Sequence, residues 1–263
     1  MTDTPAVLLG SAALDPNRWG TLELGGDPTH RLSEKRDGNT DAGFAGLELW
    51  DKHVTAVPED EVVEVLSHRL PVVVFASSAS FDDPDPTRRD QLVRWIERTG
   101  AGRVMFDIGA DYDLQEAYAE RIAAVLDQLP TGTTMLCECR QGVSLAENPI
   151  VAAEIFEAAG SPQRVQAIVH THDSSEHLRA RFDRYGDRIT HVHVNYLDFA
   201  HGAPRLVDIQ HELHAKVTLL RSLGFTGTWT LELVAGVMTE ADTPDRLLAQ
   251  AADDLRVLHE VLS

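Results

Sequence analysis

The chain has 263 residues, of which 43% are hydrophobic, and a formal net charge of -19 at pH 7. No linker or low-complexity segment divides it, so we expect a single domain over residues 1–263. The charge disfavours nucleic acid and anionic membranes as partners, because both would repel this surface. Cys137 and Cys139 are too close for an unstrained disulfide, and the apolar piece at 6–9 is too short to span a membrane. We therefore expect a cytoplasmic protein.

The elements alternate between strand and helix along the chain. A first strand at 6–11 precedes a polar loop at 15–30 and a helix at 32–42, which only the later rhythm suggests. Strands follow at 45–50, 71–76, 103–108, 133–139, 165–170, 189–195 and 228–233, with helices at 59–68, 87–99, 114–129, 148–159, 174–185, 209–223 and 244–262. About eight such units indicate an α/β fold, the (β/α)8 or TIM barrel. A doubly wound sheet is the alternative, but no Gly-rich nucleotide motif is present.

The seventh predicted strand, at 189–195, alternates between polar and apolar residues. This period places His191, His193 and Asn195 on one face. Three imidazole or amide side chains on one strand face are more than packing requires, so they are candidates for a site.

Single acids occupy comparable positions on other strands. Glu48, Glu138 and Glu232 each stand between residues that share the opposite face, so all three are expected to point into the barrel. A buried carboxylate is costly unless it is paired or bound to metal. Because barrel active sites lie at the carboxyl ends of the strands, these residues predict a divalent cation there, with oxygen and nitrogen ligands that suit Mn²⁺, Co²⁺, Zn²⁺ or Mg²⁺.

Four ordered motifs resemble the xylose isomerase-like TIM barrels, the sugar phosphate isomerase/epimerase superfamily. They are GFAGLELW at 43–50, LCECRQG at 136–142, HVHVN at 191–195 and LGFTGTWTLEL at 223–233, whereas residues before about 30 match poorly. The resemblance implies one divalent ion, Mn²⁺ before Co²⁺, Zn²⁺ or Mg²⁺, and its implied ligands are Glu138, His170, His193 and Glu232.

The sixth strand departs from the family pattern. The family usually has Asp-x-x-His where this chain reads His170-Thr171-His172-Asp173, so His172 and Asp173 remain alternatives to His170 as the ligand. A second histidine in the ligand set lowers its negative charge and favours Mn²⁺, Co²⁺ or Zn²⁺ over Mg²⁺.

The resemblance implies a metal-dependent isomerase or epimerase of a keto-sugar or polyol, in which Glu138 and Glu232 transfer protons beside a metal-bound carbonyl. The alternative on the same site is a lyase or dehydratase of a keto-sugar, keto-cyclitol or 3-keto-glycoside, including cleavage of C-glycosides. Apurinic-site DNA repair also occurs on this barrel, but the acidic charge disfavours it. A metal-free binding protein is disfavoured because the ligand positions are retained.

The expected partner is a small carbohydrate-like substrate, and the oligomeric state, whether a homo-oligomer or a complex with a partner subunit, stays open. The residues expected around the substrate are Glu48, Trp50, His53, Arg140, His172, His191, Asn195 and Arg205. Arg205 and His201 are the only basic candidates near the last two strand ends, so we expect an unphosphorylated substrate. Asp107, at the end of the fourth strand, is either a site residue or a helix cap.

Overall fold

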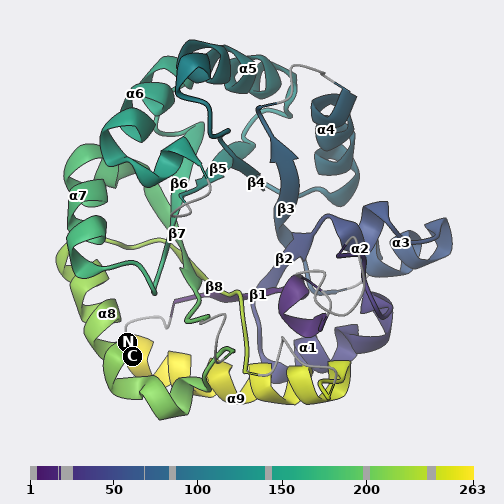
Figure 1. The fold of residues 1–263 in the computed structure, drawn as a ribbon. Coiled ribbons are helices and arrows are strands. Elements are labelled where there is room, and N and C mark those ends of the chain that lie inside the picture. Colours follow the sequence, from purple (N-terminus) through teal and green to yellow (C-terminus); the bar gives the residue numbers. More distant parts are fainter. Residues whose placement is uncertain are drawn as a thin grey trace.

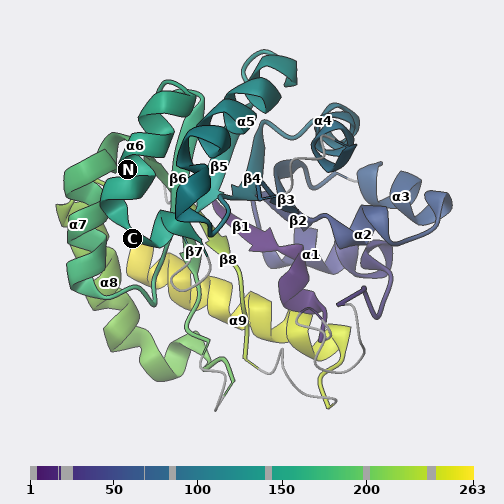
Figure 2. The ribbon, with the colours of Figure 1, turned by 45° about the horizontal axis from the view of Figure 1, so that its top comes forward.

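The computed structural model describes residues 5–16, 18, 26–67, 69–82, 87–139, 144–197, 202–235 and 241–263. Eight parallel strands pair in chain order, and β8 pairs with β1, so the sheet closes into a barrel. Helices surround this barrel on the outside (Figures 1 and 2). The single-domain (β/α)8 prediction is therefore confirmed. No described helix combines the length and the apolar character that crossing a bilayer requires.

The elements follow one another in a regular order. The strands are β1 Val7–Gly10, β2 Gly46–Trp50, β3 Val72–Ser80, β4 Arg103–Asp107, β5 Thr134–Glu138, β6 Val165–His170, β7 Ile189–Val194 and β8 Thr228–Leu231. The α-helices are α1 Arg36–Ala42, α2 Lys52–Thr55, α3 Glu59–Leu66, α4 Thr87–Thr99, α5 Gln115–Gln128, α6 Pro149–Ala159, α7 Ser175–Tyr185, α8 Gln210–Ser222 and α9 Pro244–Leu262. Short 3₁₀ helices are η1 Ser11–Leu14, η2 Leu32–Lys35, η3 Tyr112–Leu114, η4 Leu145–Glu147, η5 Gly186–Arg188 and η6 Leu206–Ile209.

Alternate residues of each strand point to opposite sides of the barrel wall, so they pack in two separate cores. Outward residues such as Leu47, Cys137 and Val192 join one large buried cluster between the strands and the helices. A smaller cluster inside the barrel contains Leu8, Val74, Leu136 and Ile168. Cys137 is a free, buried thiol, as expected if Glu138 faces the other way.

The inward face changes from apolar to polar toward the carboxyl end of the strands. One pleat, or two residues, separates inward Leu136 from Glu138 in β5, and the same step separates Ile168 from His170 in β6. Side chains two residues apart on a strand share a face, so the apolar cluster forms a floor beneath the polar groups. The barrel therefore presents its inward polar side chains at the end where TIM-barrel sites lie.

Helix α1 forms from a sequence that favours turns, because tertiary packing overrides its weak propensity. A Cβ built on Gly38 would lie 2.5 Å from Cδ2 of Leu248 in α9, so a larger residue here would require the Leu248 side chain to shift. The structure also contains α2, which the sequence pattern did not predict, and it extends β3 to Ser80, beyond the predicted end at 76.

Candidate active site and metal centre

Donor atoms from four consecutive strand ends meet inside the barrel. His170 Nε2 lies 3.1 Å from Glu138 Oε1 and 3.9 Å from Glu232 Oε2. His193 Nδ1 lies 3.5 Å and 3.3 Å from the same two oxygens. No more than 4% of any of these four side chains is exposed. The four residues that the resemblance implied as ligands thus form one buried cluster.

The spacing of these atoms suits a single small cation. Bonds of about 2.0–2.2 Å from four such donors to one divalent ion leave neighbouring donors roughly 3.0–3.6 Å apart. Three of the four separations given above lie between 3.1 and 3.5 Å. His193 Nδ1 is buried and makes no hydrogen bond to the described part of the chain, although it faces two carboxylates. A buried nitrogen in this position is a suitable metal ligand.

Electrostatics also favour a positive charge at this point. Burial lowers the pKa of His193, but the carboxylates of Glu48 and Glu232 outweigh burial and raise it well above its usual range. Burial raises the pKa of Glu232, but His193 and Arg18 outweigh burial and hold it well below its usual range. The carboxylates therefore draw a proton onto His193 in the absence of an ion, and a divalent ion would supply the same positive charge.

Glu48 lies beneath the centre and holds two histidines. Its Oε2 lies 3.1 Å from Nε2 of both His191 and His193. It also accepts a hydrogen bond from Thr230 Oγ1 at 3.1 Å. Burial raises the pKa of Glu48, but His193 and the two histidine hydrogen bonds lower it to about 2, so it stays ionised. Because Nε2 of His193 bonds to Glu48, Nδ1 is the nitrogen that faces the centre.

The alternatives on the sixth strand occupy three different environments. Asp173 forms an ion pair with the fully buried Arg181. The Oδ2 atom of Asp173 also accepts a hydrogen bond from the backbone N–H of His170 at 3.0 Å. His172 is exposed; its ring packs on the His170 ring at 4.8 Å, and its Nδ1 lies 3.2 Å from the Asn195 carbonyl. Only His170 points its nitrogen at both Glu138 and Glu232, so it is the sixth-strand member of the four-residue cluster.

Two further residues hold Glu232 in place. Arg18 donates from Nη2 to Glu232 Oε1 at 2.6 Å and from Nη1 to the backbone carbonyl of Glu232 at 3.0 Å. Asn195 donates from Nδ2 to Glu232 Oε2 at 2.8 Å. Sequence reasoning expected Asn195 near the substrate but missed Arg18. The available signal was a basic residue in the loop after the first strand, a loop that must reach the active end of the barrel.

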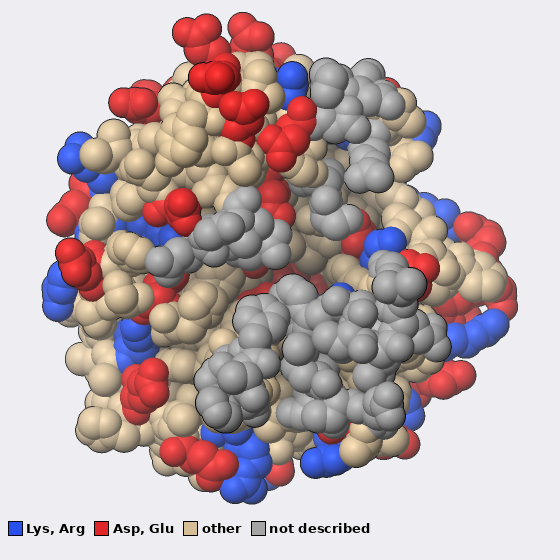
Figure 3. All heavy atoms as spheres, viewed as in Figure 1, with Lys and Arg blue, Asp and Glu red and all other residues tan. Residues whose placement is uncertain are grey.

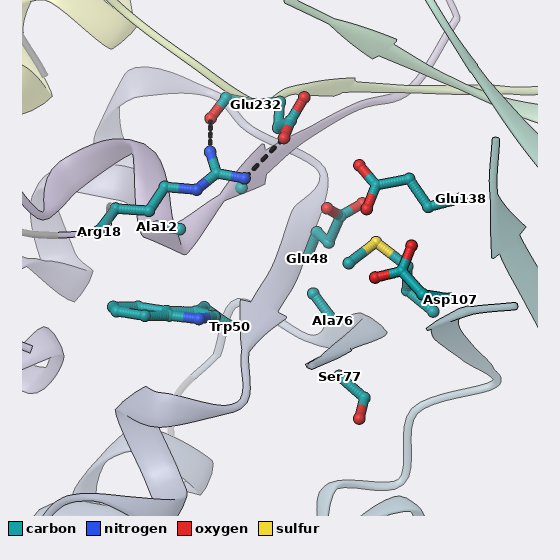
Figure 4. Close-up of a pocket in the computed structure, with 11 residues that line it drawn as sticks. Ala12, Arg18, Glu48, Trp50, Ala76, Ser77, Asp107, Glu138 and Glu232 are labelled. Carbon is teal, nitrogen blue, oxygen red and sulfur yellow. Dashed lines mark hydrogen bonds and ion pairs between the residues drawn. The ribbon is translucent and has the colours of Figure 1, made fainter. Parts of the chain in front are cut away.

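A cavity opens directly above these groups (Figure 4). Trp50 and Arg18 face it from the side of the first two strands, whereas Glu138 and Asp107 face it from β5 and β4. Gly10 is part of its wall, and a Cβ there would crowd the neighbouring backbone, at 3.2 Å from the Leu231 carbonyl oxygen. Its described lining is Gly10, Ala12, Arg18, Glu48, Trp50, Ala76, Ser77, Met105, Asp107, Glu138 and Glu232.

Several residues expected around the substrate lie elsewhere. His53 is fully buried in α2, packs against the edge of Trp50 and lies 3.0 Å from Ser11 Oγ through its Nδ1, so it is behind the cavity wall. Arg205 is exposed and pairs with Asp208, which keeps its charge at the surface. His191 lies one pleat deeper than His193, next to Glu48. Arg140 and His201 lie outside the described residues.

No family model and no curated protein matches the sequence, but solved structures do. A xylose isomerase domain protein from Alicyclobacillus acidocaldarius aligns over 98% of this chain and 99% of its own, with a TM-score of 0.63 and 15% identity. The 3-keto-D-glucoside 4-epimerase from E. coli aligns over 97% and 99%, with a TM-score of 0.60 and 16% identity. Endonuclease IV from Thermus thermophilus aligns over 88% and 93%, with a TM-score of 0.61 and 18% identity. The chain therefore has the fold of the xylose isomerase-like TIM barrels.

Proposed function

We propose that this protein is a divalent-metal-dependent isomerase or epimerase of a small keto-sugar or polyol. The observation that carries the proposal is the buried cluster of Glu138, His170, His193 and Glu232 beneath a cavity that both glutamates line. Two nitrogen and two oxygen donors suit Mn²⁺, Co²⁺ or Zn²⁺ better than Mg²⁺, and Mn²⁺ is the ion that we expect first.

The chemistry divides between the ion and the two glutamates. When bound, the ion would act as a Lewis acid that polarises a substrate carbonyl. Glu138 and Glu232 come from different strands, so one carboxylate can take a proton from the carbon beside the carbonyl while the other returns a proton. Arg18 and Asn195 hold Glu232 in one orientation through both of its oxygens. A fixed carboxylate lies closer to the geometry that proton transfer requires.

The cavity supports a small substrate without negative charge. Its volume is about 190 Å³, below the ~300–1,000 Å³ of pockets for drug-sized ligands. Glu48, Asp107, Glu138 and Glu232 line it, and Arg18, the basic residue among the described lining, is paired with Glu232. Such a site would repel a phosphate, whereas hydroxyl groups can donate to its carboxylates. Trp50 offers an apolar face to the sugar carbons.

Nucleic acid is not the partner that we propose, although endonuclease IV shares the fold. The chain carries a net charge of -19, and acidic side chains gather on the face shown in Figure 3, over the end that carries α5 and α6. Binding to DNA depends on basic groups that neutralise phosphates. A DNA backbone would meet repulsion here instead.

The decisive experiment is solvent deuterium exchange across a panel of keto-sugars and keto-polyols, with Mn²⁺ present and after chelation. We expect metal-dependent deuterium uptake beside a carbonyl, together with an epimer or isomer as the product. A dehydrated or cleaved product would assign the site to a lyase, which begins with the same proton abstraction. The proposal is wrong if no substrate exchanges, or if exchange is undiminished after the metal is removed.

A further inference from the structure

A second cluster of ligand-type side chains lies outside the centre described above. It contains Asp15, directly after η1, His30, shortly before η2, and His53 in α2. The side chains of Asp15 and His53 are fully buried, and only 8% of the His30 side chain is exposed. The cluster stands behind Trp50, whose ring packs edge-on against the His53 ring with 5.2 Å between the ring centroids.

One oxygen of Asp15 faces a nitrogen of each histidine. Oδ2 lies 3.3 Å from His30 Nδ1 and 3.8 Å from His53 Nε2. Neither nitrogen makes a hydrogen bond to any residue that the structure describes, and neither does His30 Nε2. Buried polar atoms normally find a partner, so buried ring nitrogens that face a carboxylate oxygen are suited to bind a cation between them.

Hydrogen bonds around the cluster orient these ligand atoms. The Ser11 hydroxyl accepts the backbone N–H of Trp50 at 2.9 Å and lies 3.0 Å from His53 Nδ1. A proton on Nδ1, donated to Ser11, leaves the lone pair of Nε2 directed at Asp15. Thr29 donates its backbone N–H to Asp15 Oδ2 at 2.8 Å and its hydroxyl to Oδ1 at 3.0 Å. Metal-binding histidines and carboxylates are typically held by such second contacts.

The kind and number of the donor atoms fit a divalent cation. His30 and His53 each offer a ring nitrogen, and Asp15 offers a carboxylate oxygen. Two nitrogens and one carboxylate oxygen are a frequent ligand set for Zn²⁺, which completes its shell with a further ligand such as water.

We propose that Asp15, His30 and His53 form a second divalent-cation site, of the zinc class, with a structural role. The ion would join the segment after β1, the segment before η2 and helix α2. The first of these segments carries Arg18, whose backbone N–H donates to the Asp15 carbonyl at 3.3 Å. The second site would thereby position the guanidinium that holds Glu232, without touching the substrate.

Zinc titration of chelator-treated protein, with a competing chromophoric chelator, tests the proposal. The key variant is His30→Gln, which keeps a similar volume, and His170→Gln disables the proposed catalytic centre separately. Exposed His214 in α8 supplies the matched control, His214→Gln. Circular dichroism spectra of all variants report whether each remains folded.

We expect the unaltered protein to bind two equivalents, His30→Gln and His170→Gln to lose one each, and the double variant to lose both. If His30→Gln is the one single variant that binds less zinc than the unaltered protein, the second site is supported even when the catalytic centre binds no zinc. Equal binding by His30→Gln, His214→Gln and the unaltered protein would overturn the proposal. If His30→Gln does not fold, crystals of the unaltered protein grown with Zn²⁺ decide instead. An anomalous peak between Asp15, His30 and His53 supports the site, and its absence refutes it.

Discussion

Arg18 and Glu232 form an ion pair between residues 214 positions apart in the chain, with 2.6 Å between Nη2 and Oε1. The same guanidinium donates to the Glu232 backbone carbonyl at 3.0 Å. One side chain from the loop after the first strand thus fixes both the carboxylate and the backbone at the end of the last strand. The contact links the segment after the first strand to the end of the last strand at the candidate active site (Figure 4).

Replacing Arg18 with Gln should slow catalysis while leaving the fold intact. A hydrogen bond to a charged group contributes about 1.5–3 kcal/mol, so the rate of deuterium incorporation is expected to fall roughly ten- to hundred-fold. The matched control is Arg31→Gln, because Arg31 is an exposed arginine that pairs with the exposed Asp60. Equal rates in both variants would show that Arg18 does not position Glu232.

Replacing Glu138 with Gln removes one of the two proposed proton-transfer groups but keeps the size of the side chain. Formation of labelled product should fall about 10²- to 10⁴-fold, the usual contribution of general acid–base catalysis. Exposed Glu154 in α6 gives the control variant Glu154→Gln. Full activity of Glu138→Gln would refute the two-glutamate mechanism.

Glu48→Gln should weaken metal binding without removing a ligand. The carboxylate holds Nε2 of His193 at 3.1 Å and so directs Nδ1 toward the centre. Loss of such an outer contact typically costs 10–100-fold in metal affinity, roughly. Competition titration with Mn²⁺ and Zn²⁺ measures the change, and Glu64→Gln, at an exposed site in α3, should bind as the unaltered protein does.

Asp173→Asn separates a structural carboxylate from a metal ligand. Asp173 and Arg181 form a fully buried ion pair, and breaking such a pair costs about 3–5 kcal/mol because one charge remains unpaired. We expect a lower free energy of unfolding in urea but an unchanged metal stoichiometry at the centre. Loss of metal with little change in stability would make Asp173 the sixth-strand ligand.

Asp254 predicts a pH-dependent change in stability. Burial, only partly offset by hydrogen bonds from Leu206 and Gln250, raises its pKa from 3.8 to about 6. The folded state therefore favours the protonated carboxyl group of Asp254. The resulting contribution to folding stability is fully present below pH 3.8 and is lost as the pH rises through about 6. Above pH 6 the charged form should cost up to about 3 kcal/mol, from a shift of roughly two units.

The variant Asp254→Asn tests whether the ionised form of Asp254 lowers the free energy of unfolding. It should raise the free energy of unfolding above pH 6 and make little difference below pH 3.8, because asparagine keeps an oxygen for the Leu206 N–H. Urea unfolding across this pH range measures the difference, with Asp183→Asn, at an exposed position in α7, as the control. A variant that is less stable at every pH would contradict the prediction.

Prediction from sequence succeeded where the signal is local. Period-two alternation determined the inward direction of Glu138, His193 and Glu232, because neighbouring strand residues must point to opposite faces. The rhythm of strands and helices determined the barrel, because parallel strands need helical crossovers. The strand-six ligand stayed open, because His170, His172 and Asp173 all stand within one short run.

Only the tertiary structure decided which loops and side chains meet. It paired Asp173 with Arg181, buried His53 behind Trp50, left Arg205 at the surface and brought Arg18 onto Glu232. These contacts depend on the closure of the barrel and on the path of irregular segments, neither of which has a sequence period. The order of the elements and the inward acids were thus determined by the sequence itself, whereas the division of labour among the polar residues followed from the three-dimensional packing.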